Sequence, residues 1–337
     1  MKAVLLKFLS TVKRYRMIEE GDRILAAVSG GPDSVFLLHL LTRFKRKLGI
    51  GEICVAHVNY GKRGRESDLD QEFVEKLSVH LGFELFVKSV SPAHLSRVKK
   101  ENFQKVARDI RYRFFNKVQK SWGADRIAVA HTLDDQAETV FMRVIAGQGL
   151  KGLKGIPPVT RDGIIRPLIE ISRMEVVDFL ESESLGFRVD TSNIEGTYER
   201  NRIRNEAFPL LERITGRDVK RKVWGLGEIF REIDEAVLAM TDTALKEAFS
   251  WRGKELDVDR YRDNCRIVRI SMLQKIGYEC LRTEFNQRVL KKADSLLVRD
   301  LPSFTMSLPG GYVLERSYKT ALFKKAEKEE EKPIELT

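Results

Sequence analysis

The chain contains a six-residue string suited to phosphate chemistry, Ser29-Gly30-Gly31-Pro32-Asp33-Ser34, directly after a short apolar segment. The two glycines let the backbone approach an anion, and the amides and dipole at a helix start stabilise its charge. The hydroxyls of Ser29 and Ser34 add donors. Asp33 would repel a phosphate unless a cation lay between them, which indicates Mg²⁺. A plain strand–turn–helix with a first-turn acid is the alternative, and the complete string favours a phosphate site.

A second string, His131 to Thr139, also follows an apolar segment and carries two carboxylates. On a helix His131 and Asp135 are four residues apart and Asp135 and Glu138 three apart, so all three can share one face. Two carboxylates at the carboxyl end of a strand could bind a metal or an ammonium group. The alternative is a helix start enriched in acids that stabilise the dipole.

Arginines recur in two further places. Arg108 and Arg111 are about one helical turn apart, and paired guanidinium groups suit a phosphate or the charge that develops at phosphorus during attack. Surface arginines that brace an apolar stripe are an equally good interpretation. In residues 200–205 arginines alternate with Asn and Ile, so some of these arginines are expected to turn inward.

Four short apolar segments could position these groups, and helical patterns lie between them. They are residues 24–28, 53–58, 84–87 and 127–130. Short, partly β-branched apolar segments are typical of buried parallel strands. The alternation of strand and helix predicts a doubly wound parallel sheet whose ligands bind at the carboxyl ends of its strands.

The rest of the chain predicts a second, smaller domain. A Gly-rich loop from Gln148 and a helix over residues 174–185 come first, followed by a long helix over about residues 219–249 with one buried apolar stripe. That stripe comprises Val223, Leu226, Phe230, Ile233, Val237 and Met240. Residues 251–325 resemble a small α+β module with a hairpin at residues 309–311, and the charged tail beyond it is expected to be frayed.

Composition narrows the class of protein. A chain of 337 residues with 42% hydrophobic residues can fold into two domains, and its net charge of +11 favours a polyanionic partner such as nucleic acid. Its three cysteines stand singly, which gives no support to a zinc or iron–sulfur site and fits a reducing compartment. No apolar run is long enough to span a bilayer. We therefore expect a cytoplasmic protein without a membrane segment.

The phosphate string lacks the Walker pattern and resembles the PP-loop of the ATP-pyrophosphatases, which cleave ATP between its α and β phosphates. Further strings narrow the resemblance to the tRNA(Ile)-lysidine synthetase family over about residues 20–215: AHVNYGKRGRESD, ARDIRYRFF, HTLDDQAET, GLKGLKGI, RPL, DTSN and RNRIRN. After His57 the chain has Tyr60 and Lys62 where this family often has a second His and a Leu, so the resemblance gives Tyr60 no role.

The resemblance implies a Rossmann-like PP-loop domain over residues 1–215, a helical linker over 216–250, a tRNA-binding domain over 251–325 and a tail over 326–337. From the resemblance we expect no room in this chain for the further C-terminal domain of longer members. It also implies an ATP-dependent ligase that joins free L-lysine to C2 of the wobble cytidine of the isoleucine tRNA with a CAU anticodon. An adenylated base would be the intermediate. Oligomeric state stays open, with a homodimer among the candidates.

The same resemblance implies residue roles. The ATP-binding set is Ser29, Gly30, Gly31, Asp33, Ser34, His57 and Arg108, with Asp33 as the Mg²⁺ ligand. The catalytic set is Asp33, Arg111, Asp135 and Glu138. The lysine-binding set is Asp135, Glu138 and Arg204. The main alternative is a tRNA thiolase of the same superfamily, although such enzymes usually need paired cysteines. A non-catalytic RNA-binding protein and a small-molecule amidating synthetase explain fewer of these features.

Overall fold

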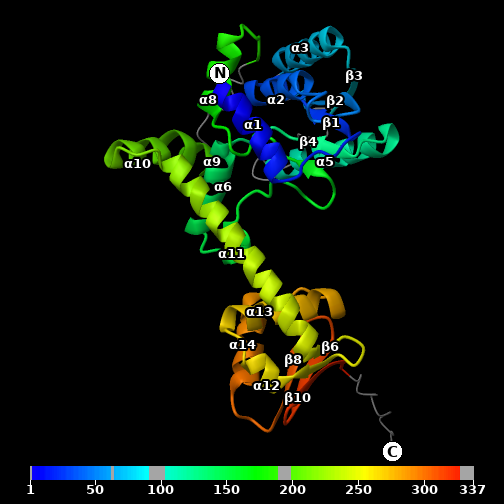
Figure 1. Ribbon diagram of the computed structural model, residues 1–337, viewed down its shortest axis with the longest axis vertical. Coiled ribbons are helices and arrows are strands. Elements are labelled where there is room, and N and C mark those ends of the chain that lie inside the picture. The colour runs from blue at the N-terminus through cyan, green and yellow to red at the C-terminus, as the bar shows by residue number, and fades with distance from the viewer. Residues whose placement is uncertain (1, 62–63, 91–102, 189–198, 327–337) are drawn as a thin grey trace, which may run out of the picture. The chain divides into compact units, whose positions relative to one another are not determined.

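The computed structural model describes residues 2–61, 64–90, 103–188 and 199–326. It divides into two compact units, Met1–Ile229 and Phe230–Thr337, called unit 1 and unit 2 below. Unit 1 contains a parallel sheet of order β3-β2-β1-β4-β5 (Figure 1). Its strands are β1 (Arg23–Ala27), β2 (Glu52–Asn59), β3 (Glu84–Ser89), β4 (Arg126–Ala128) and β5 (Ile164–Ile165). The predicted doubly wound α/β fold is confirmed, and β5 extends the sheet by one strand that was not predicted.

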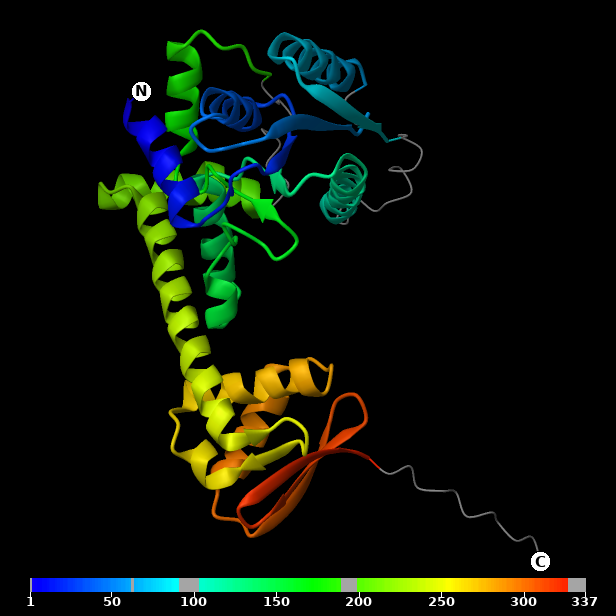
Figure 2. The ribbon, with the colours of Figure 1, turned by 45° about the vertical axis from the view of Figure 1, so that its right-hand side comes forward.

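Alternate residues of β1 face opposite layers of helices. Ile24 and Ala26 join the core formed with α2 (Pro32–Arg43), α3 (Arg65–Leu81) and α8 (Arg173–Ser182). Leu25 joins the second core, formed with α5 (Phe103–Trp122). Figure 2 shows the sheet between these layers. Burial on both faces explains why the central strands β1 and β2 are mostly apolar after their first residue.

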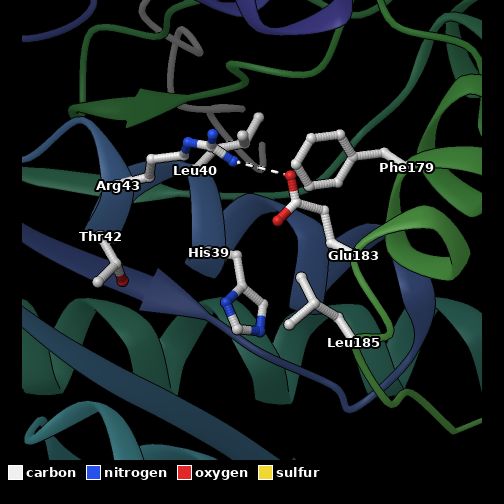
Figure 3. A pocket seen from close by; sticks show the side chains of 7 residues that line it. All are labelled: His39, Leu40, Thr42, Arg43, Phe179, Glu183 and Leu185. Carbon is white, nitrogen blue, oxygen red and sulfur yellow. Dashed lines mark hydrogen bonds and ion pairs between the residues drawn. The ribbon is translucent and has the colours of Figure 1, made fainter. Parts of the chain in front are cut away.

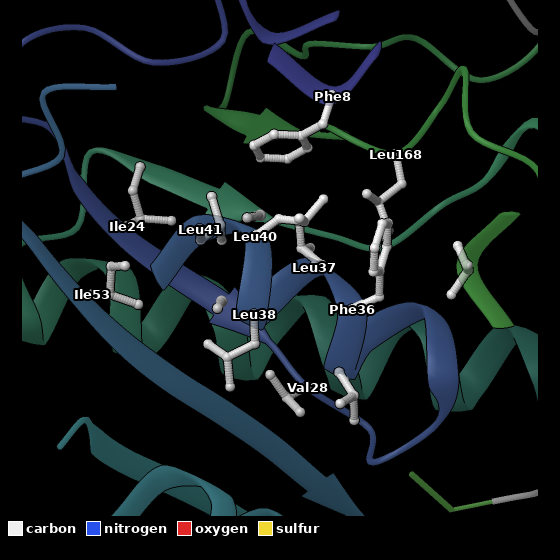
Figure 4. Close-up of a cluster of buried hydrophobic side chains, with 14 of the residues drawn as sticks. Phe8, Ile24, Val28, Phe36, Leu37, Leu38, Leu40, Leu41, Ile53 and Leu168 are labelled. Atoms are coloured by element: carbon white, nitrogen blue, oxygen red, sulfur yellow. The ribbon is translucent and has the colours of Figure 1, made fainter. Parts of the chain in front are cut away.

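The larger core includes a helix that was not predicted, α1 (Lys2–Arg14). Its Phe8 is fully buried and stacks on Phe44 with ring centroids 5.9 Å apart. Figure 4 shows Phe8 above the apolar side chains of α2, among them Leu37 and Leu40. Helix α1 therefore contributes to the layer that fixes α2, the helix that follows the phosphate string.

Helix α6 (Leu133–Ile145) follows β4 and holds the Gly-rich loop. Its buried Gln136 accepts a hydrogen bond from the Ile156 amide at 2.5 Å and donates to the Lys154 carbonyl at 3.0 Å. Arg143 donates to the carbonyls of Gly152 and Gly155. The loop, which includes the short helix α7 (Leu150–Leu153), is thereby attached to one face of α6.

Residues 199–248 form four helical elements: α9 (Glu199–Arg202), the π-helical turn η3 (Ile203–Ala207), α10 (Phe208–Thr215) and α11 (Val219–Ala248). Gly227 lets α11 approach α6 closely, since a Cβ atom there would lie 2.9 Å from Val140 Cγ2. The expectation of one buried stripe along α11 is wrong. Leu226, Ile233 and Met240 are 46%, 41% and 54% exposed.

Much of the apolar stripe stays exposed because α11 packs mainly through the residues near its two ends. Val223 lies against a small cluster in unit 1 that includes Phe208. Ala244 and Leu245 join the core of unit 2. An apolar pattern on a helix predicts a face that prefers burial, but it does not show that partners line the whole helix.

Unit 2 is a small α+β structure, as predicted. Its antiparallel sheet has the order β6-β7-β10-β9-β8. The strands are β6 (Phe249–Ser250), β7 (Glu255–Asp257), β8 (Ser303–Leu308), β9 (Tyr312–Ser317) and β10 (Thr320–Lys325), and the helices are α12 (Val258–Arg262), α13 (Arg266–Lys275), η4 (Ile276–Cys280) and α14 (Gln287–Val298). The predicted hairpin is confirmed by the pairing of Leu308 with Tyr312. Within the described ranges, no helix combines the length and apolar character needed to cross a bilayer.

Candidate functional site

The phosphate string connects β1 to α2 at the carboxyl end of the sheet's central strand. Gly30 has φ +93°, a conformation that side-chain-bearing residues rarely adopt. Gly31 is the N-cap of α2 without a side-chain cap, and Pro32 occupies the first turn, where its missing amide costs nothing. The amides at the start of α2 are therefore available to an anion.

Two serine hydroxyls fix the shape of this turn. Ser34 Oγ donates to the Gly31 carbonyl at 2.9 Å and accepts from the Ser29 amide at 3.1 Å. The two hydroxyl oxygens are 3.2 Å apart. Ser29 and Ser34 thus close the loop on itself, and both hydroxyls lie beside the amides that would meet a phosphate.

Asp33 lies in the first turn of α2 and is half-paired. Its Oδ2 accepts from Arg173 Nη2 at 2.9 Å, while its Oδ1 is buried without a partner among the described residues. Burial, with nearby Asp135 and Asp134, raises the pKa of Asp33 despite the Arg173 guanidinium. No group of three metal-ligating side chains occurs in the described part of the chain. Asp33 nevertheless fits Mg²⁺, because this ion commonly takes one or two carboxylates plus substrate phosphates.

Asp135 has two roles in the structure. It forms a capping box with Thr132, whose amide donates to Asp135 Oδ2 at 2.9 Å, so the helix-start interpretation is confirmed. Its Oδ1 also lies 3.4 Å from Arg200 Nη2 and 3.3 Å from Arg204 Nη2. Burial opposes ionisation, but Arg200, the Thr132 amide and Arg173 outweigh it and lower the pKa of Asp135.

Glu138 lies one turn further along α6 and is fully buried. Its carboxylate accepts from Arg200 Nε at 2.7 Å, from Arg204 Nε at 2.5 Å and from Arg204 Nη2 at 2.9 Å. The intervening Arg202 points outward, with 67% of its side chain exposed. The structure therefore brings together Asp135, Glu138 and Arg204, as predicted, and confirms that only some of these arginines turn inward.

Two cations of this cluster were not predicted. Arg173 starts α8, and its amide donates to Asp134 Oδ2 at 2.8 Å. Lys220 starts α11, and its ammonium contacts Asp134 Oδ1 at 2.9 Å. A basic residue in the first turn of a helix opposes the helix dipole, and this is the one sequence signal that could have marked both. With them, each carboxylate of the cluster has a cationic neighbour.

His57 lies near the carboxyl end of β2 and borders the phosphate loop. Its Nδ1 lies 2.9 Å from the Val28 carbonyl, so Nδ1 is the protonated nitrogen and Nε2 an acceptor. Nε2 is buried without a partner among the described residues. Burial lowers the pKa of His57, which keeps the ring neutral. A buried acceptor beside the loop suits a donor group of a ligand.

The paired arginines of α5 are exposed rather than bound to the phosphate loop. Arg111 Nε donates to the Tyr60 hydroxyl at 3.2 Å, and that hydroxyl donates to the Ala107 carbonyl at 2.9 Å. Arg108 lies over the Tyr112 ring at 4.7 Å. Tyr60, which had no role from sequence, thus links the Arg111 side chain to the Ala107 carbonyl of the same helix. No contact with the loop supports a shared phosphate site for the two arginines in this structure.

His131 does not lie on the face of α6, contrary to the expectation, because Thr132 caps that helix and His131 precedes it. Arg166, which is 3% exposed, donates from Nε to His131 Nδ1 at 3.1 Å and from Nη1 to the Pro157 carbonyl at 2.7 Å. Burial lowers the pKa of His131 to about 4. The ring is therefore neutral, and its remaining proton is on Nε2.

Other features lie outside this cluster. The DTSN string (residues 190–193), Lys62 and Arg63 fall outside the described residues. A cavity of about 200 Å³ lies between α2 and α8, where Arg43 pairs with Glu183 (Figure 3). It contains none of the predicted site residues and is smaller than typical ligand pockets.

Comparison with known proteins supports this description. A family model described as a PP-loop domain matches residues 4–211. The tRNA(Ile)-lysidine synthase of Clostridium acetobutylicum is 43% identical over 222 residues, which cover 66% of this chain and 48% of that protein. The tRNA(Ile)-lysidine synthase of Caldanaerobacter subterraneus is 36% identical over 253 residues, or 75% and 54%. The chain spans about half the length of the curated relatives it matches.

Among solved structures, the chain resembles the U34-tRNA thiolase NcsA from Methanococcus maripaludis, with a TM-score of 0.54 and 20% identity. The likeness covers 68% of this chain and 79% of that one. At this identity the likeness shows a common fold. The resemblance to lysidine synthetases, first inferred from short strings, is confirmed by the curated relatives.

Proposed function

Because this chain belongs to the PP-loop domain family, we propose that it uses ATP to join lysine to C2 of the wobble cytidine in the isoleucine tRNA with a CAU anticodon. The observation that carries the proposal is the cluster of Asp135, Glu138, Arg200 and Arg204, which is close enough to the PP-loop for Asp33 and Asp135 to act on the same guanidinium of Arg173. A PP-loop alone serves many acceptors. A buried cluster of both charges next to it suits a zwitterionic amino acid.

The first step activates the base. The C2 oxygen of cytidine attacks the α-phosphorus of ATP, pyrophosphate leaves, and the base carries AMP on that oxygen. The amides of Gly30 and Gly31 with the hydroxyls of Ser29 and Ser34 would hold the pyrophosphate moiety. His57 Nε2 would accept a hydrogen bond from the nucleotide. Mg²⁺ bound to Asp33 would offset the repulsion between this carboxylate and the phosphates.

The second step replaces the activated oxygen. The ε-amine of lysine attacks C2, and AMP leaves with the oxygen that the base supplied. Free lysine is an ammonium ion at neutral pH, so one proton must be lost as the C–N bond forms. Asp135 is better placed than Glu138 to meet the ammonium, because Glu138 is fully buried behind two arginines. We assign Glu138 to holding Arg200 and Arg204, which would face the lysine carboxylate.

Arg108 and Arg111 are proposed to stabilise the charge on the α-phosphate once the tRNA and ATP are bound. The support is their place on α5, where the charge of Arg108 already acts on His131 and Arg166. Tyr60 holds Arg111 by a hydrogen bond at 3.2 Å that a small side-chain rotation would break. Both arginines would therefore move toward the ligand rather than bind it in place.

Residues 251–325, which belong to unit 2, are proposed to bind tRNA. The support is the net charge of +11 on the chain together with exposed aromatic side chains, Tyr278 at 62% and Tyr318 at 73% exposure. Bases stack on such rings while lysine and arginine neutralise phosphates. Tyr318 has φ +49° and lies between β9 and β10, where its carbonyl accepts from Arg316 Nε at 2.8 Å.

A thiolase would need a reactive cysteine, and the cysteine of unit 1 is unsuited to this. Cys54 lies on β2 in the core, and burial raises its pKa to about 12. A buried thiol with a raised pKa is a poor nucleophile. The lysine ligase therefore remains the better proposal.

The test is an incorporation assay with ATP, radiolabelled lysine and a CAU-anticodon isoleucine transcript. We expect label on the tRNA with formation of AMP, and no label on methionine tRNA, which has the same anticodon. Absence of label, or equal labelling of both tRNAs, would overturn the proposal. Run in heavy-oxygen water, ligation should yield AMP without heavy oxygen, because the base supplies that atom. AMP that carries heavy oxygen would instead reveal simple ATP hydrolysis.

A further inference from the structure

An ion pair at the PP-loop leaves two complementary atoms without partners. Arg173 Nη2 donates to Asp33 Oδ2 at 2.9 Å. Within the described part of the chain, the second oxygen of Asp33 and the Nε of Arg173 are both buried and make no hydrogen bond. An arginine and a carboxylate often pair through two parallel hydrogen bonds, and this pair makes only one. A buried polar atom without a partner costs free energy, so each such atom calls for an explanation.

The two atoms have opposite requirements. The free carboxylate oxygen of Asp33 accepts a cation or a donor, whereas the free N–H of Arg173 requires an acceptor oxygen. A phosphate with its divalent cation supplies both at once. Asp33 lies in the first turn of α2, where the amides after Gly31 already favour an anion.

The position of Arg173 is fixed from three directions. Its own amide is held by Asp134 Oδ2 at 2.8 Å. The start of α8 is closed by a capping box between Ser172 and Glu175, and Glu175 is in turn bound by Lys7 of α1. A cation in the first turn of a helix is unfavourable toward the helix dipole. Its placement there is consistent with a role toward an anion.

We propose that Arg173 is a substrate-binding residue of the PP-loop, whose Nε donates to an oxygen of the pyrophosphate moiety of ATP while Asp33 keeps its second oxygen for the divalent cation. This deepens the proposed function, since it rests on the use of ATP at this loop. Arg173 then binds the phosphates of ATP before the reaction and the pyrophosphate after it. Its bond to Asp33 Oδ2 also keeps the other oxygen of that carboxylate turned toward the cation.

The direct test measures binding rather than turnover. Inorganic pyrophosphate and Mg·ATP are titrated into the full chain by calorimetry, for the wild type and for Arg173→Lys and Arg173→Met. Lysine keeps a positive charge next to Asp33 but has no Nε–H. We expect each variant to bind pyrophosphate about 10- to 100-fold more weakly, as the loss of a hydrogen bond to a charged group predicts.

A second ion pair between the same two helices provides the control. Arg43 of α2 pairs with Glu183, just beyond α8, at 3.1 Å, beside the cavity of Figure 3. Arg43→Met removes a comparable cross-helix arginine at the other end of the contact, and we expect its pyrophosphate affinity to equal that of the wild type. Melting curves of all variants report whether each one folds.

A third variant distinguishes the role of Asp33 Oδ1 from that of Arg173 Nε. Without divalent cations, Asp33→Asn should bind pyrophosphate more tightly than the wild type, because it removes a negative charge and releases Arg173. If Arg173→Lys and Arg173→Met bind pyrophosphate as the wild type does, the inference is overturned while the proposed use of ATP stands. If the wild type binds neither pyrophosphate nor Mg·ATP, the proposed function fails as well.

Discussion

Loss of the guanidinium of Arg204 should destabilise unit 1 strongly. Arg204 donates to both oxygens of Glu138, at 2.5 and 2.9 Å, and this carboxylate is fully buried. Removing one partner of a buried ion pair typically costs about 3–5 kcal/mol. Since Arg200 still holds Glu138 at 2.7 Å, we place the cost of Arg204→Met near the lower end, about 3 kcal/mol.

The change in melting temperature that this loss of free energy causes depends on the size of unit 1. For a domain of roughly 150–250 residues, 1 kcal/mol corresponds to about 2–4 °C. The calorimetric Tm of unit 1 should therefore fall by about 6–12 °C in Arg204→Met. The matched control is Arg202→Met, two residues away, because Arg202 is 67% exposed and lies 3.6 Å from an equally exposed Glu206. An exposed pair of this kind contributes up to about 1 kcal/mol.

A double-mutant cycle with Glu138→Gln tests the cause. Once Glu138 is neutral, loss of Arg204 should cost much less, so the two changes should be clearly non-additive. Two results would contradict a stabilising role of the Arg204–Glu138 pair: a Tm for Arg204→Met equal to that of Arg202→Met, or additive effects of Arg204→Met and Glu138→Gln. Either would mean that the buried charges do not stabilise one another.

Three further predictions concern the loop, its acid sensitivity and the tRNA. Gly30→Ala should cost about 1–2 kcal/mol of unfolding free energy and weaken ATP binding, because φ is +93°; an unchanged urea midpoint would contradict this. The ordinary pKa of His131 is 6.5 and its pKa in the folded chain is about 4. Between pH 6.5 and pH 4 the unfolded chain therefore binds a proton at His131 that the folded chain does not, so the free energy of unfolding falls as the pH drops from 6.5 to 4. His131→Gln should flatten this slope, and parallel urea midpoints for both chains would exclude His131 as its cause. Tyr318→Ala should weaken tRNA binding about tenfold in a filter assay, as loss of one stacked base predicts, while Tyr318→Phe should retain it; equal loss in both would disprove stacking.

The central strands could be predicted because their sequence and burial agree. Each of the four apolar segments became a strand of the parallel sheet, since both faces of that sheet are covered. Strand β5 has only two residues and forms through its pairing with Ile127 and Ala128. So short an apolar run carries no periodicity, and it becomes a strand only by joining an existing sheet edge.

The site could be predicted where its residues are close in sequence. The string from His131 to Thr139 supplied the carboxylates, and some arginines of residues 200–205 were expected to turn inward, as Arg200 and Arg204 do. Arg173 pairs with Asp33 across 140 positions, and Lys220 pairs with Asp134 across 86. Contacts over such separations arise from tertiary packing, which local spacing does not encode. The contacts of Tyr60 could not be predicted for the same reason, because they depend on where α5 packs.

The most direct test of the central claim is the identity of the wobble nucleoside after reaction. The CAU-anticodon isoleucine transcript is incubated with the protein, ATP and lysine, digested to nucleosides and analysed by mass spectrometry. We expect the wobble cytidine to be replaced by a nucleoside heavier by one lysine less one water, only when both ATP and lysine are present. An unchanged cytidine despite AMP formation, or a product that contains sulfur, would contradict it.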